Sequence, residues 1–211
     1  MIDLKEYSNL RGNVPLRYAR GHFATNHSHI NYYIDITYNK TRLSEAKETA
    51  KELVSHFINN TPVDTIICLD GTAMLGGCVA EELTKTGFRT LNAHQTIYVI
   101  EPEMNNQSMI LLRDNTQNMV KGKHVMVLMA SCTTGMTARR AIEAITYYGG
   151  YVAGVAAIYR AVDEVDGYPV RSVYSVNDIP DYQSYDFRDC PYCKKGVRLE
   201  ALINCHGYSA L

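Results

Sequence analysis

Long apolar runs are absent from this chain of 211 residues. No stretch approaches the roughly 18 consecutive apolar residues that identify a membrane-spanning helix, so no membrane partner is expected. An excess of one charge is absent as well, because 21 Lys and Arg face 22 Asp and Glu and leave a formal net charge of -1. This balance does not predict binding to nucleic acid. The N-terminus lacks the apolar core of a secretory signal, and we therefore expect a cytoplasmic protein.

Internal repeats and low-complexity segments are also absent. The composition that is present suits an ordinary globular domain, with 46% apolar and 20% charged residues. The length is enough for one large core together with a small additional piece. In a reducing compartment the cysteines are expected to be thiols or metal ligands rather than disulfides. They are Cys68, Cys78, Cys132, Cys190, Cys193 and Cys205.

Strand-like and helix-like segments alternate through the middle of the chain. The expected strands are residues 31–37, 64–69, 96–100, 108–112, 125–129, 151–159 and 170–176, and the expected helices are 43–58, 73–85 and a third through 138–145. This alternation predicts an α/β fold with a mainly parallel sheet and helices on both faces. Ligands of such folds bind at the carboxyl ends of the strands. We assign residues 1–180 to this domain and treat the Tyr- and Cys-containing residues 181–211 as a small C-terminal appendage.

A short polar loop, Thr133-Thr134-Gly135-Met136-Thr137, lies between the strand 125–129 and a helix start. Helix N-termini present unpaired N–H groups and partial positive charge, so they bind anions well. Threonine hydroxyls add donors, and a glycine lets the backbone approach a ligand closely. An ordinary helix N-cap made by threonine is the alternative, and the five residues alone leave both interpretations open.

The same segment resembles the signature of the type I phosphoribosyltransferases, which is a strand, two acidic residues, two apolar residues and then T-T/A-G-x-T. Residues 22–35 (HFATNHSHINYYID) resemble the F-x-L-x-S-G-x-x-S-x-Y-Y-I-D pattern of the orotate branch. The resemblance covers roughly residues 15–175 in the right order. It implies the fold of that family, an N-terminal hood segment over about residues 1–40, and transfer between phosphoribosyl pyrophosphate and a pyrimidine-like base. It also implies a homodimer, Mg²⁺ in catalysis, and either phosphoribosyl pyrophosphate or a nucleoside monophosphate as ligand.

The resemblance further assigns residues to three parts of the ligand. The 5′-phosphate would be held by Ser131, Cys132, Thr133, Thr134, Gly135, Met136 and Thr137. The pyrophosphate would be held by Asp70, Gly71, Thr72 and Ala73, and the base by Tyr32, Tyr33 and Arg160. Without the resemblance, Arg160 is better explained as an ion pair with Asp163 or Glu164, and the two tyrosines as half-buried strand residues.

Two parts of the family pattern are missing. Met129 and Ala130 occupy the positions of the two acids that would hydrogen-bond the ribose hydroxyls, a loss of about 1.5–3 kcal/mol for each charged contact. The place of a lysine-rich loop is taken by residues 101–106, where Glu101 and Glu103 either repel pyrophosphate or hold Mg²⁺. The chain is therefore expected to be a phosphoribosyltransferase with altered chemistry or, as the alternative, a nucleotide-binding sensor or regulatory module. A hydrolase or lyase that handles phosphoribosyl groups is a weaker third hypothesis.

Histidine and cysteine side chains form a second group of candidates. His22, His27 and His29 could bind a metal, but their match to the orotate-branch loop favours polar lining of the pocket. Cys190 and Cys193 form a C-P-x-C-x-x-G turn typical of a zinc knuckle, and Cys205 is the candidate for a third ligand of a structural Zn²⁺. Free thiols and a redox pair are the alternatives.

Overall fold

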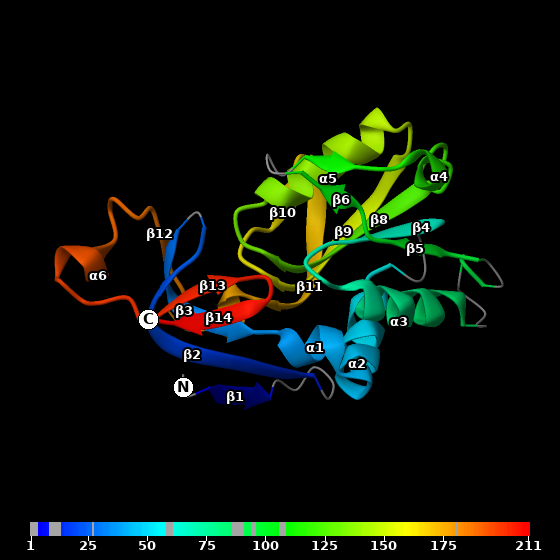
Figure 1. The fold of residues 1–211 in the computed structure, drawn as a ribbon. Coiled ribbons are helices and arrows are strands. Elements are labelled where there is room, and N and C mark those ends of the chain that lie inside the picture. Colours follow the sequence, from blue (N-terminus) through cyan, green and yellow to red (C-terminus); the bar gives the residue numbers. More distant parts are fainter. Residues whose placement is uncertain are drawn as a thin grey trace.

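The computed structural model describes residues 4–8, 14–26, 28–57, 61–85, 91–93, 96–105, 109–179 and 181–211. Two six-stranded sheets form its frame (Figure 1). The central sheet has the order β10-β11-β9-β8-β4-β5. A hood sheet, made of β12-β3-β2-β13-β14 with β1 paired to β2, lies beside it and combines the first and last strands of the described chain.

The central sheet is mainly parallel. Its strands are β4 (Thr65–Cys68), β5 (Tyr98–Ile100), β8 (His124–Cys132), β9 (Tyr151–Arg160), β10 (Glu164–Val165) and β11 (Tyr168–Ser175). All neighbours pair in parallel except β10, which forms an antiparallel hairpin with β11. Continuous apolar runs suit this arrangement because strands of a parallel sheet are covered on both faces. The predicted α/β fold is confirmed.

Helices cover both faces of this sheet. On one face lie α2 (Leu43–Val54) and α3 (Ala73–Thr84), whose apolar residues form one core cluster with Met126 and Leu128 of β8. On the other face, α5 (Met136–Tyr147) packs in a second cluster that contains Val127 and Met129. Successive β8 side chains thus alternate between the two cores. No helix within the described ranges combines the length and the apolar character needed to cross a membrane.

Short elements complete the chain. They are α1 (Thr37–Thr41), α4 (Asp114–Gln117), the 3₁₀ turn η1 (Val176–Asp178), α6 (Pro191–Lys194), and the small β6 (Glu103–Met104) and β7 (Ile110–Leu111) hairpin. The α1 helix directly after β3 was not expected from the sequence. It joins the hood sheet to the helices of the central domain.

The hood sheet combines N-terminal and C-terminal residues. Its strands are β1 (Lys5–Ser8), β2 (Pro15–Ala24), β3 (His29–Asp35), β12 (Ser184–Tyr185), β13 (Ala201–Asn204) and β14 (Gly207–Ala210). Strand β12 pairs with β3, and β13 pairs in parallel with β2. Figure 1 shows the C-terminal hairpin against these N-terminal strands. A domain boundary near residue 180 stays a prediction, but residues from both sides of it share one sheet.

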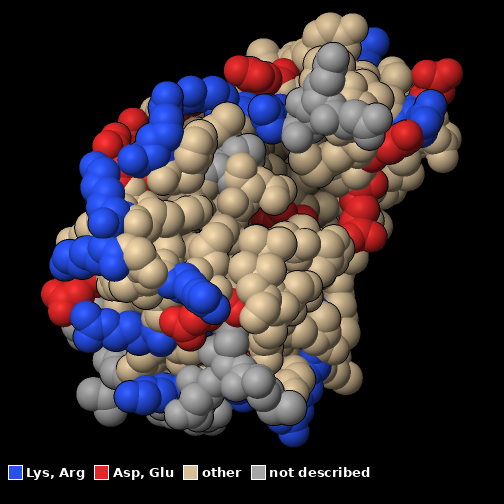
Figure 2. Space-filling view, turned by 60° about the vertical axis from the view of Figure 1, so that its left-hand side comes forward, with Lys and Arg blue, Asp and Glu red and all other residues tan. Residues whose placement is uncertain are grey.

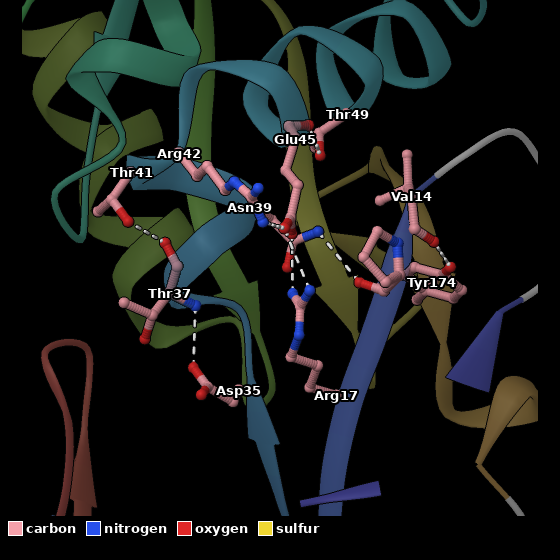
Figure 3. Close-up of polar contacts among 11 residues, drawn as sticks. Val14, Arg17, Asp35, Thr37, Asn39, Thr41, Arg42, Glu45, Thr49 and Tyr174 are labelled. Carbon is pink, nitrogen blue, oxygen red and sulfur yellow. Dashed lines mark hydrogen bonds and ion pairs between the residues drawn. The ribbon is translucent and has the colours of Figure 1, made fainter. Parts of the chain in front are cut away.

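Polar contacts fasten the hood sheet to the helices (Figure 3). The guanidinium of Arg17 in β2 donates to both carboxylate oxygens of Glu45 in α2, at 2.8 and 3.1 Å. Asn39 of α1 donates through its Nδ2 to the carbonyl of Pro15 at 3.2 Å, and the hydroxyl of Tyr174 donates to the carbonyl of Val14. A bidentate pair fixes orientation as well as distance. These contacts hold β2 in one position over the central domain.

Candidate active site

A pocket of about 290 Å³ lies between the central sheet and the hood sheet. Its walls come from the loop after β8, the turn after β4, strand β3 with helix α1, and the turn between β13 and β14. Of the residues that the structure describes, Lys40 is the one cation and Asp70 the one carboxylate in this lining. Figure 2 shows that the middle of this face is hollowed and mostly uncharged, while Lys and Arg gather along one side. An anion in this pocket would meet mainly backbone amides, hydroxyls and Lys40.

The loop expected to bind phosphate reaches the pocket at the carboxyl end of β8. Gly135 has φ of 77° and is the N-cap of α5, with no side-chain cap hydrogen bond, so threonine does not act as the cap. A Cβ at this glycine would lie 2.7 Å from Cγ2 of Val165. Burial raises the pKa of Cys132 to about 11. Of the residues predicted to bind phosphate, Cys132, Gly135 and Met136 are not part of the pocket lining. The loop residues in the lining are Ser131, Thr133, Thr134 and Thr137.

The turn expected to bind pyrophosphate follows β4. Asp70 and Gly71 both have positive φ, 57° and 70°, and only Asp70 of this turn lines the pocket. Thr72 is buried and its hydroxyl donates to the carbonyls of Leu69 and Leu128, which fixes the turn against β8. Burial raises the pKa of the Asp70 carboxyl, while the Ala130 backbone amide and the nearby Lys40 charge oppose that shift. A partly buried acid whose pKa is raised in a cleft is a candidate functional residue.

Lys40 is a pocket residue that the sequence analysis missed. It lies on α1, is only 6% exposed, and donates from Nζ to the main-chain carbonyls of Asp70 and Cys205. A lysine is rarely buried unless its charge is satisfied. Its position after the Y-Y-I-D match was the one available signal, and only the contact with the turn at Asp70 reveals its role.

Comparison with known proteins shows which proteins this chain is similar to. No family model matches the chain. The orotate phosphoribosyltransferase of Caldanaerobacter subterraneus subsp. tengcongensis is 33% identical over 81 residues, which is 37% of this chain and 40% of that protein. The chain thus spans less than half the length of that relative. The orotate phosphoribosyltransferase of Pelotomaculum thermopropionicum is 29% identical over 181 residues, covering 84% of this chain and 85% of the relative.

Solved structures agree on the fold. UMP synthase of Leishmania donovani superposes with a TM-score of 0.57 at 17% identity, over 85% of this chain and 36% of that one. Adenine phosphoribosyltransferase of Thermoanaerobacter pseudethanolicus gives a TM-score of 0.52 at 14% identity, over 68% of this chain and 88% of that one. This chain has the type I phosphoribosyltransferase fold. Its sequence resembles the orotate branch of that family.

Within this phosphoribosyltransferase fold, the expected base side of the pocket is aromatic. Tyr32 and Tyr33 line the pocket and are buried, rather than half-buried. The structure adds Tyr159 and Tyr182, whose ring centroids lie 5.7 Å apart. The Tyr159 hydroxyl is buried without a hydrogen-bond partner within the described part of the chain. Burial raises the pKa of Tyr159 far above its ordinary value, so the hydroxyl is an intact donor.

Arg160 is not placed with these aromatic residues. Its guanidinium forms an ion pair with Asp163, and it is not part of the pocket lining. This is the alternative that the sequence offered for Arg160. A contact between Arg160 and a base would require the side chain to leave Asp163.

The positions of the missing acids differ from each other in the structure. Ala130 lines the pocket, whereas Met129 is buried in the α5 core on the other face of the sheet. The Glu103 carboxylate accepts from Nε of Arg113 at 2.7 Å on the protein surface, and neither Glu101 nor Glu103 lines the pocket. Residue 106 of that loop lies outside the described residues.

The structure places the candidate cysteines and histidines with other neighbours than the sequence predicted. Cys205 lines the pocket at the β13–β14 turn and does not join Cys190 and Cys193. His22 and His29 lie beside those two cysteines instead and are not among the pocket-lining residues, contrary to the expected role in the pocket. The expected role of the histidines was wrong because the cysteines that approach them lie more than 160 residues further along the chain, so no local pattern links the two pairs. His27 lies outside the described residues.

Proposed function

We propose that this chain binds phosphoribosyl pyrophosphate in the pocket and transfers its phosphoribosyl group to a pyrimidine-like base of the orotate type. The observation that carries the proposal is the convergence of the Gly135 loop, Asp70 and Lys40 on one cavity at the carboxyl ends of β8 and β4. Ligands of doubly covered parallel sheets bind at this edge. The similarity to orotate phosphoribosyltransferases supports the same assignment.

The 5′-phosphate fits the loop 133–137. The left-handed φ of Gly135 turns the chain into α5, and Thr133, Thr134 and Thr137, on either side of this glycine, line the pocket. A phosphate at a helix N-terminus gains from these donors and from the helix dipole.

The pyrophosphate fits the side of the pocket that contains Lys40 and Asp70. Transfer breaks the bond from the ribose carbon to a pyrophosphate oxygen and forms a bond to a base nitrogen, so negative charge grows on the leaving group. Preorganised cations and amides stabilise such developing charge. Two main-chain carbonyls hold Lys40 for this role, and within the described part of the chain no carboxylate forms an ion pair with it.

Mg²⁺ is implied by the resemblance. Asp70 is the pocket carboxylate among the described residues, and Mg²⁺ is usually held by one or two carboxylates together with substrate phosphates. The residues therefore fit an ion shared between Asp70 and the diphosphate. When bound, the ion would neutralise charge on the leaving pyrophosphate.

The base fits the aromatic wall made of Tyr32, Tyr33, Tyr159 and Tyr182. A planar pyrimidine can stack on these rings, and the unpaired Tyr159 hydroxyl can donate to a carbonyl of the base. We include in this proposal an orotate-type base, a homodimer and the cytoplasmic location predicted from the sequence.

A second candidate function is binding of a nucleotide without turnover, as in a sensor or regulatory module. One observation favours it: Ala130 faces the pocket with a methyl group where the family has a ribose-binding acid. Ribose hydroxyls there would lack one charged acceptor. Binding of the phosphate would survive this loss, but positioning of the ribose for transfer would suffer.

Two measurements test the proposal. Thermal denaturation is followed with phosphoribosyl pyrophosphate, orotidylate or uridylate, using Thr134→Val as the control that should lose the shift. Turnover is then assayed with orotate and Mg²⁺. Turnover well above the Thr134→Val background supports transfer, whereas stabilisation without turnover supports the sensor. Absence of stabilisation by all three ligands would exclude both functions.

The variant Ala130→Asp separates the two functions further. It adds an acceptor at the pocket, whereas Met129→Glu would bury a charge in the α5 core. Turnover that appears only in Ala130→Asp would show that the natural chain binds without catalysing transfer.

A further inference from the structure

Four metal-binding side chains meet at the far end of the hood sheet, outside the pocket. His22 lies in β2 and His29 begins β3, while Cys190 and Cys193 flank the first turn of α6. One ligand atom from each residue lies within 4.8 Å of all the others. More than 160 residues of sequence separate the histidines from the cysteines, and no cysteine of the chain forms a disulfide.

The spacing of these atoms matches the edges of a zinc tetrahedron. Zn–S bonds of about 2.3 Å and Zn–N bonds of about 2.0–2.1 Å give edges of about 3.3–3.4 Å between two nitrogens and about 3.5–3.6 Å between nitrogen and sulfur. Nε2 of His22 lies 3.2 Å from Nδ1 of His29. The sulfur atoms of Cys190 and Cys193 lie 3.4 and 3.7 Å from Nε2 of His22, and that of Cys193 lies 3.3 Å from Nδ1 of His29.

Hydrogen bonding alone does not explain this arrangement. Nε2 of His22 faces two sulfur atoms and a second imidazole nitrogen at once. A ring nitrogen carries at most one hydrogen or one lone pair, so it can serve only one of these three neighbours well. A cation at the centre interacts with all four ligand atoms at the same time.

The surroundings of His22 set its ring for metal binding. Its Nδ1 lies 3.0 Å from the carbonyl of Val197, so an Nδ1–H donates there and leaves Nε2 as the free electron-pair donor. The ring is also 1% exposed and stacks on Tyr192 at 5.2 Å. A carbonyl on the second ring nitrogen is the usual support of a zinc-binding histidine.

The cysteine turn is equally constrained. Pro191 begins α6 directly after Cys190, and the amide of Lys194 donates to the Cys190 carbonyl at 3.1 Å. Gly196, with φ of 70°, closes the turn by donating to the Cys193 carbonyl at 2.9 Å. Both thiols are thus presented from one rigid turn toward the two histidines.

The geometry points to a structural Zn²⁺ site of the Cys₂His₂ type formed by His22, His29, Cys190 and Cys193. Two thiolates and two imidazoles suit zinc, and four protein ligands leave no open position for catalysis. Each thiol releases its proton on binding. The ion fastens residues 190–193 to β2 and β3. It thereby also restrains the following β13–β14 hairpin, whose residues Asn204, Cys205 and Gly207 line the pocket.

Metal analysis of the purified full chain tests the site. Protein produced with added zinc is expected to contain one Zn²⁺ per chain by elemental mass spectrometry. Cys193→Ser and His29→Asn should each weaken zinc affinity by more than about 100-fold in chelator competition, since even the loss of an outer-shell partner costs about 10–100-fold. Cys193 is exposed, so its replacement does not disturb the core. Cys205→Ser and His124→Asn are the matched controls and should keep the metal.

Cobalt provides a measurement that does not depend on the variants. Co²⁺ bound to the unmodified chain should give the intense visible bands of tetrahedral coordination and charge-transfer bands of two thiolates. Protein that binds no zinc at micromolar free ion, a weak octahedral cobalt spectrum, or loss of zinc in Cys205→Ser equal to that in Cys193→Ser would overturn the assignment.

Discussion

The ammonium group of Lys40 donates a hydrogen bond to the main-chain carbonyl of Asp70. This contact joins α1, which follows the hood sheet, to the turn after β4. It places a buried cation at the point where the two parts of the molecule form the pocket. The positive charge in the site therefore depends on the position of the hood sheet.

Replacement of this cation should weaken binding of a phosphorylated ligand. Lys40→Met is expected to lower affinity for phosphoribosyl pyrophosphate by about 10- to 100-fold, because a hydrogen bond to a charged group is worth about 1.5–3 kcal/mol. Titration calorimetry at two salt concentrations measures the effect and its reduced salt dependence. Lys47→Met, on the exposed face of α2, is the control and should bind normally. Equal affinities of the two variants would exclude a role for Lys40.

Gly135 should tolerate no side chain. Gly135→Ala is expected to lower the free energy of unfolding by at least about 1–2 kcal/mol, because the residue has a left-handed φ and the new Cβ would lie 2.7 Å from Val165. Phosphate-dependent stabilisation should be lost as well. Gly77→Ala, in α3 with open space around it, should instead raise the free energy by about 0.5–1 kcal/mol. Denaturant unfolding with and without ligand distinguishes the two, and destabilisation by both variants would contradict the prediction.

The unpaired hydroxyl of Tyr159 should matter for binding and not for folding. Tyr159→Phe is expected to leave the stability of the free protein unchanged or slightly higher, because it removes a buried hydroxyl without a partner. Nucleotide affinity should fall by up to about tenfold, the value of one neutral hydrogen bond. Tyr174→Phe is the matched control, since its buried hydroxyl donates to Val14. That variant should lose about 1 kcal/mol of stability and keep its affinity.

Asp70 should make stability depend on pH. Burial raises the pKa of its carboxyl in the folded state, so the folded chain binds a proton more readily than the unfolded chain. Its stabilising contribution is complete below the ordinary pKa of 3.8 and is lost as pH rises through the folded pKa. Asp70→Asn should therefore raise the melting temperature at pH 7, with a gain that disappears in acid. Asparagine also tolerates the positive φ of this position. A gain that is constant with pH would contradict the assignment.

The same variant should damage function. Asp70→Asn removes the pocket carboxylate that fits Mg²⁺, so Mg²⁺-dependent stabilisation by phosphoribosyl pyrophosphate should disappear. Stabilisation by inorganic phosphate at the Gly135 loop should remain. Opposite changes in stability and function are expected where a site contains a strained or unfavourably buried group.

Local patterns predicted the main strands of the central sheet and its helices because the strands are continuous apolar runs of strand length and the helices have an apolar stripe at helical spacing. The run 125–129 became the middle of β8, and the stripe after Leu43 became α2. Strand β2 was missed, since its ten residues mix buried and partly exposed positions without a clean period of two. Helix α1 was missed because five residues give too little periodicity.

The amino-acid sequence by itself determined the α/β alternation, the glycine loop before α5 and the C-x-x-C turn, because each is fixed by residues within a few positions of one another. Only the tertiary structure decided that Lys40 faces Asp70, and that His22 and His29 rather than Cys205 approach Cys190 and Cys193. These contacts join residues of separate strands and helices. Their formation depends on how the hood sheet packs and on which C-terminal strand pairs with β2, and no local spacing encodes that choice.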